Sequence, residues 1–165
     1  MLFRSWALNR REEAVAHQRD LLRLNPNDDQ GLRYRQAEWL LWLQRYDELN
    51  ELFAAYDSDN SAALAYTKAL AIFRRHGFEN AKSFLDEARA ANPHVIAYLT
   101  GRKEMPAEVP AHVAFGDEDE AVEYVARAAA LWARVPGALE WLEFSSTAPR
   151  RSPVSRLRGL APRRR

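Results

Sequence analysis

Apolar residues recur along this chain at intervals of three and four, the spacing that places side chains on one face of an α-helix. The clearest stripe consists of Ala62, Ala65, Tyr66, Ala69, Leu70 and Phe73. A second stripe follows, formed by Ala81, Phe84, Leu85 and Ala88. Because each stripe mixes small and large residues, we expect the alanines to let neighbouring helices approach and the aromatic rings to fill the gaps.

Two kinds of marker interrupt these stripes at a regular distance. A helix end, a tight turn and an acidic helix start begin at Leu8, Leu43 and Arg75. A short polar turn recurs at residues 25–26, 57–59 and 92–93. Both markers repeat about every 34 residues, which indicates a helix hairpin repeated along the chain.

Residues that begin and end helices lie at the borders of these segments. Asp28 or Asp29 is suited to cap a helix that begins near Gln30. Gly77 follows the cationic residues 74–76, as expected at a helix C-terminus.

The first repeat carries a specific string of residues around its turn. The string is Leu8-Asn9-Arg10-Arg11-Glu12-Glu13-Ala14, ending in Leu24-Asn25-Pro26-Asn27-Asp28. It resembles the second-helix half of the tetratricopeptide repeat (TPR), although Gln18 stands where a large apolar residue is usual. The resemblance covers residues 6–93. It implies an all-α fold, an α-solenoid of antiparallel helix pairs with a concave groove that often holds a peptide or helix.

The period ends after Pro93. We expect a short helix at 94–99, an irregular connection, a long helix from Glu118 to Arg134 and a last short helix at 138–144. An atypical final pair suits the cap of a solenoid.

A second resemblance covers residues 92–142. It is carried by Asn92-Pro93-His94-Val95, Tyr98-Leu99, Gly116-Asp117, Glu120-Ala121, Tyr124, Trp132 and Gly137-Ala138-Leu139. These residues resemble a segment of the suppressor of tumorigenicity seven family and its bacterial relatives. Eukaryotic members are longer and have predicted membrane segments. This chain has no apolar run of the roughly 18 residues that a span requires, so that property is not carried over.

The predicted organisation is one TPR-like helical domain followed by a basic, disordered tail. The domain covers residues 1–144 and the tail residues 145–165. The domain consists of an incomplete first repeat at 1–27, two repeats at 28–60 and 61–93, and a capping region at 94–144.

The charge of the chain is unevenly distributed. Residues 1–143 carry 17 basic and 23 acidic side chains, a net charge of −6. The tail carries only arginines: Arg150, Arg151, Arg156, Arg158, Arg163, Arg164 and Arg165. The tail is thus suited either to dock on the acidic body or to bind nucleic acid or another anionic surface with a strong salt dependence.

The sequence offers no recognisable catalytic chemistry. It has no Cys, its four His do not form a zinc-spaced pair, and no nucleophile or phosphate-binding motif is present. The acidic run Asp117–Glu123 suits a helix N-terminus, with a docking patch for a basic partner or metal as the alternative. We therefore expect no catalytic residue, cofactor, metal, small-molecule substrate or membrane insertion, and a cytoplasmic location.

The predicted function is that of a non-enzymatic protein–protein interaction scaffold, which binds a partner peptide or helix in a helical groove. The alternative is nucleic-acid or anionic-surface binding through the tail. Trp39 and Trp42 share a helix face and belong either to the core between repeats or to an aromatic anchor in the groove. The partner-binding candidates are Arg33, Tyr34, Arg35, Trp39, Trp42, Tyr66 and His94.

Overall fold

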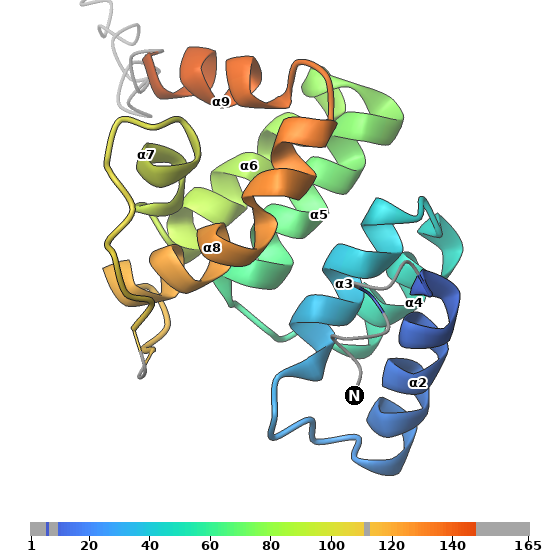
Figure 1. Ribbon diagram of the computed structural model, residues 1–165. Coiled ribbons are helices and arrows are strands. Elements are labelled where there is room, and N and C mark those ends of the chain that lie inside the picture. Colours follow the sequence, from blue (N-terminus) through green and yellow to red (C-terminus); the bar gives the residue numbers. More distant parts are fainter. Residues whose placement is uncertain (1–5, 7–9, 111–112, 148–165) are drawn as a thin grey trace, which may run out of the picture.

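The computed structural model of the chain describes residue 6 and residues 10–110 and 113–147. Within these residues the fold is all-α, with eight helices and no strand (Figure 1). The helices are α2 (Arg11–Leu24), α3 (Leu32–Trp42), α4 (Tyr46–Ala55), α5 (Ala62–His76), α6 (Phe78–Ala91), α7 (Val95–Leu99), α8 (Glu118–Arg134) and α9 (Ala138–Thr147). The predicted fold class is confirmed at the level of an all-helical protein.

Three of the helices begin at equivalent positions of the predicted repeat. α2 begins at Arg11, α4 at Tyr46 and α6 at Phe78. α2 and α4 carry two acidic residues in the first turn and α6 carries one, where carboxylates meet the positive end of the helix dipole. The repeat in the sequence therefore corresponds to a repeated helix start.

The turn before α3 depends on Asp28. Its carboxylate oxygens accept hydrogen bonds from the backbone amides of Leu32 at 2.7 Å and Arg33 at 2.8 Å. Asp28 thus satisfies two of the free N–H groups at the helix start, as predicted for a capping residue. The helix begins at Leu32 rather than near Gln30, because Gly31 adopts a φ of 65° and extends the turn.

A single glycine joins α5 to α6. Gly77 has a φ of 80° and a ψ of 175°, a conformation that residues with a Cβ rarely adopt. It ends α5 directly after the cationic residues 74–76, as predicted, and α6 starts at the next residue. The two helices therefore fold back on each other as a hairpin (Figure 1).

The core is closed by α8, which packs on α5 (Figure 1). The side chains of Tyr66, Tyr124 and Trp132 are fully buried where these helices meet. The rings of Tyr66 and Trp132 are 6.5 Å apart, and Nε1 of Trp132 donates a hydrogen bond to the Tyr124 hydroxyl at 2.9 Å. Each such ring buries roughly 150–250 Å², so this cluster anchors α8 on the hairpin.

The last helices form a terminal pair. α8 has the predicted bounds, whereas α9 extends to Thr147, beyond the predicted end at residue 144. α9 packs against α5, where the ring of Trp141 stacks on Phe73 with centroids 4.6 Å apart.

Candidate functional site

A cleft of about 480 Å³ lies between the turn before α3 and α8; we call it the α3–α8 cleft. It brings together parts of the chain that are distant in sequence. The lining residues are Asp28, Asp29, Gln30, Gly31, Arg33 and Tyr34 around the start of α3, Ser61 and Ala63 at the start of α5, Pro110, Val113 and Phe115 before α8, and Glu120, Glu123, Tyr124 and Arg127 on α8.

Arg33 ties the turn before α3 to the turn before α5. Its Nε lies 2.6 Å from Oδ2 of Asp59, and its Nη1 lies 2.9 Å from Oδ2 of Asp28. Its Nη2 donates to the hydroxyl of Tyr34 at 2.5 Å. Burial alone would raise the pKa of Asp59, but hydrogen bonds from Ser61 and Arg33 outweigh it and lower that pKa. The Arg33 guanidinium is therefore already engaged within the cleft wall.

A largely buried ion pair connects α3 to α8. Oε1 of Glu38 lies 3.2 Å from Nη2 of Arg127, which also pairs with Glu123 one turn earlier on α8. Burial removes water from the Glu38 carboxylate and raises its pKa to about 7, although the charges of Arg127 and Arg35 oppose this shift. The seam between α3 and α8 therefore contains a carboxyl group that changes charge near neutral pH.

Glu120 fixes the start of α8 against two other helices. Its Oε1 accepts a hydrogen bond from the amide of Ala62 at 2.8 Å. Its Oε2 accepts from the amide of Gly116 at 2.8 Å and from Nδ2 of Asn92 at 2.9 Å. Asn92 also donates to the carbonyl of Asp117 at 2.8 Å. One buried carboxylate therefore joins the start of α5, the end of α6 and the start of α8.

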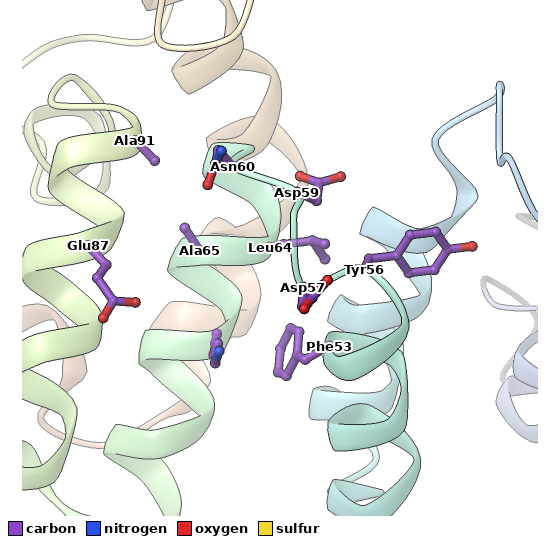
Figure 2. Close-up of a pocket in the computed structure, with 10 residues that line it drawn as sticks. Phe53, Tyr56, Asp57, Asp59, Asn60, Leu64, Ala65, Glu87 and Ala91 are labelled. Carbon is purple, nitrogen blue, oxygen red and sulfur yellow. The ribbon is translucent and has the colours of Figure 1, made fainter.

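A second hollow, of about 130 Å³, lies between α4, α5 and α6 (Figure 2). Figure 2 shows Ala65 of α5 between Phe53 of α4 and Glu87 of α6, with Leu64 on the side of α5 that faces α4. The ammonium group of Lys68 lies 5.9 Å from the centroid of the Phe53 ring. This hollow is smaller than the roughly 300–1,000 Å³ of ordinary ligand sites and already contains a cation of the chain, so the α3–α8 cleft is the better candidate.

The partner-binding residues predicted on α3 lie in different settings. Arg33 and Tyr34 line the α3–α8 cleft, and Arg35 is partly buried beside them. Trp39 is buried and stacks on Trp6, with ring centroids 4.5 Å apart. Of the two settings predicted for Trp39, it therefore occupies the core and not the groove surface. Trp42 is half-buried, with the guanidinium of Arg134 lying 4.6 Å from its ring centroid.

The other two predicted residues lie outside the cleft lining. Tyr66 is fully buried against Tyr124 and Trp132, which removes it from any surface that a partner can reach. His94 is exposed at the start of α7, and its side chain does not cap that helix. The tail arginines at positions 150–165 lie outside the described residues.

The buried charges of the site were not predicted. Glu38 stands in an otherwise apolar stretch of α3, and a charge at such a position needs a partner. Glu120 is the third residue of α8, the position from which a glutamate can reach back to the amides before a helix. The predicted helix-start interpretation of the acidic run includes Glu120, but its bonds to α5 and α6 depend on the tertiary fold.

In the described part of the chain, no group of three His, Cys, Asp or Glu side chains is placed to hold a metal ion. None of the described helices combines the length and apolar character needed to cross a membrane.

Comparison with known proteins identifies distant relatives. The chain is 32% identical over 155 residues to the suppressor of tumorigenicity 7 protein of Macaca fascicularis, with 82% of this chain and 29% of the relative covered. It is 31% identical over 156 residues to the suppressor of tumorigenicity 7 protein-like of Homo sapiens, with 82% and 27% covered. The protein of Mus musculus gives 32% over 155 residues, with 82% and 27% covered.

These matches establish distant homology to the suppressor of tumorigenicity 7 family, which confirms at that level the resemblance seen at residues 92–142. The chain spans less than a third of the length of these curated relatives. No protein-family model matches the chain, and no solved structure matches it.

Proposed function

We propose, from distant homology to the suppressor of tumorigenicity 7 proteins, that this chain is a non-enzymatic scaffold that binds a peptide or helix of another protein in the α3–α8 cleft. In this proposal the helices form a TPR-like α-solenoid. The hairpins α3–α4 and α5–α6 are consecutive repeats, and α8 and α9 close the stack. The equivalent starts of α2, α4 and α6 support this arrangement.

The exposed apolar side chains beside the cleft are the main support for a binding role. Phe115 is 69% exposed and Val113 is 42% exposed, and both line the cleft. Exposed apolar residues next to polar groups are typical of protein-binding surfaces. The charged groups Arg33 and Arg127 are paired with carboxylates of the chain, which favours a binding surface over a reactive centre.

The test is affinity capture with the full chain as bait, followed by measurement of partner binding to variants. Phe115→Ala and Asp29→Lys change exposed lining residues, so we expect both to keep the native helicity and to weaken binding at least tenfold. Circular dichroism checks the fold, and titration of the captured partner gives the affinity.

Phe78→Ala is the matched control. Phe78 is 56% exposed on α6 and does not line the cleft, so the same chemical change there is expected to leave binding unaltered. Equal losses from Phe115→Ala and Phe78→Ala, or full binding by both cleft variants, would contradict the proposed site.

A further inference from the structure

The α3–α8 cleft has an apolar rim that the described fold leaves open. Eight large apolar side chains are exposed in the described residues, and half of them lie between α7 and α8. They are Met105, Val109, Val113 and Phe115, which we call the apolar rim. Val113 and Phe115 also line the cleft, so these two residues connect the apolar rim to the cleft.

The same stretch of chain is strongly acidic. Residues 104–123 contain seven Asp and Glu residues and no Lys or Arg. Three of the carboxylates are engaged within the fold, through Lys103, Arg127 and the hydrogen bonds of Glu120. The exposed ones are Glu104, Glu108, Asp117 and Asp119. A ligand that covers the apolar rim therefore gains from positive charge.

The chain itself contains a segment with that chemistry. Residues 150–165 carry seven arginines and no acidic residue. Apolar residues are interleaved with them at three-residue intervals, namely Val154, Leu157 and Leu160. The combination of cationic and apolar side chains matches the acidic, apolar surface described above.

The second hollow of the fold is a poorer acceptor for this segment. It is smaller, and Asp59 on its edge is already paired with Arg33. The length of the tail is sufficient for docking at the cleft. The chain that follows Thr147 can extend to about 60 Å at roughly 3.4 Å per residue, whereas a domain of this size has a radius of gyration of about 15 Å.

We propose that residues 150–165 bind the apolar rim and the α3–α8 cleft of the same chain and compete there with the partner. The competition rests on the proposed partner-binding function of the cleft. A tethered segment is present at an effective concentration in the millimolar range, so even a modest intrinsic affinity is sufficient. The preferred partner of the cleft is accordingly another segment that combines basic and apolar residues.

The absence of cysteine from the sequence allows a direct test with the full chain. A nitroxide attached to the variant Ser155→Cys weakens NMR signals of nearby backbone amides. We expect at least half of the signal intensity to be lost at Val109, Val113 and Phe115, and little at Asp57 and Glu87 around the second hollow. In 1 M salt, where the Debye length falls to about 3 Å, the intensities should recover.

Paired variants test the charge complementarity. Glu104→Gln with Glu108→Gln removes two exposed carboxylates next to rim residues in the sequence and should restore most of the lost intensity. The control, Glu51→Gln with Glu79→Gln, removes two exposed carboxylates elsewhere and should leave the signal loss unchanged.

The docking proposal is overturned if the signal loss is uniform over the surface or centred on Asp57 and Glu87. It is also overturned if the loss appears only between chains, in a mixture of nitroxide-bearing chains with isotope-labelled ones. If the tail does occupy the cleft, replacing its seven arginines by glutamine should strengthen partner binding. The gain is roughly tenfold if the tail occupies nine clefts in ten.

The outcomes separate this inference from the proposed function. If the tail is not found at the cleft but Phe115→Ala still abolishes partner capture, only the docking proposal fails. If the tail is found there but no captured partner responds to Phe115→Ala, the docking stands and the partner-binding function fails.

Discussion

The side-chain amide of Asn92 donates a hydrogen bond to the carboxylate of Glu120 across 2.9 Å, although the two residues are far apart in the sequence. Asn92 follows the last residue of α6, Glu120 lies in the first turn of α8, and both are buried. Because the carboxylate receives two further N–H donors, from Ala62 and Gly116, it fixes the position of α8 and hence of one cleft wall.

Replacing Glu120 by glutamine should destabilise the fold. An ionised carboxylate only accepts hydrogen bonds, whereas the glutamine amide places an NH₂ group toward N–H donors that already surround the site. We expect Glu120→Gln to lower the free energy of unfolding by roughly 2–3 kcal/mol, measured by urea denaturation. Asp119→Asn, at the exposed neighbouring position, should change it by less than about 0.5 kcal/mol. Similar effects from the two variants would contradict the role given to Glu120.

The aromatic cluster provides a second prediction about stability. Trp132 is fully buried, so Trp132→Ala should cost about 3–5 kcal/mol of unfolding free energy through the cavity that it leaves. Phe115 is 69% exposed, and Phe115→Ala should cost less than about 0.5 kcal/mol. Thermal and urea denaturation measure both. A loss below about 1 kcal/mol for Trp132→Ala would mean that the cluster does not anchor α8.

Local signals in the sequence were sufficient to predict the helices. The repeat marker identified the starts of α4 at Tyr46 and α6 at Phe78, because a tight turn followed by acidic residues is a local arrangement. The same was true of α8, whose apolar stripe and acidic first turn lie within one segment. For α3 only an approximate start near Gln30 was predicted, because the positive φ of Gly31 lengthens a turn that the sequence alone does not define.

The candidate site was predicted only in part. Arg33 and Tyr34 line the cleft, but their neighbour across it, Arg127, was not singled out. Pairing of Glu38 with Arg127 requires α3 to pack on α8, and no local pattern specifies that contact. Tyr66 was assigned both to the apolar stripe and to the partner-binding candidates. Tyr66 is buried, as its position in the apolar stripe predicts, because α5 is covered by both α6 and α8.

Arg33 should prove more important for stability than its partial exposure suggests. Its planar guanidinium donates to Asp28 and Asp59 at once, a geometry that the single ammonium group of lysine cannot reproduce. We expect Arg33→Lys to lower the unfolding free energy by about 1–2 kcal/mol in urea denaturation. Arg75→Lys, on the exposed end of α5, should have almost no effect. An equally small effect of Arg33→Lys would show that binding both carboxylates at once does not require the planar guanidinium group.

Glu38 should make the stability of the protein depend on pH. Burial raises its pKa in the folded chain from 4.5 to about 7, so the folded chain binds more protons than the unfolded chain between these values. The free energy of unfolding therefore falls as the pH rises through this window. Well below pH 4.5 the carboxyl group is protonated in both states, and this contribution to the pH dependence vanishes.

The pH dependence can be isolated by comparing the chain with Glu38→Gln, which cannot ionise at this position. Between about pH 4.5 and pH 8, the unfolding free energy of the unmodified chain should fall relative to the variant by on the order of 3 kcal/mol, as 1.36 kcal/mol per pKa unit requires. The ion pair with Arg127 forms only when Glu38 is ionised, so its contribution is already included in this difference. Urea denaturation at a series of pH values gives the difference. Parallel curves for the two chains would show that the Glu38 carboxyl group does not titrate near neutral pH.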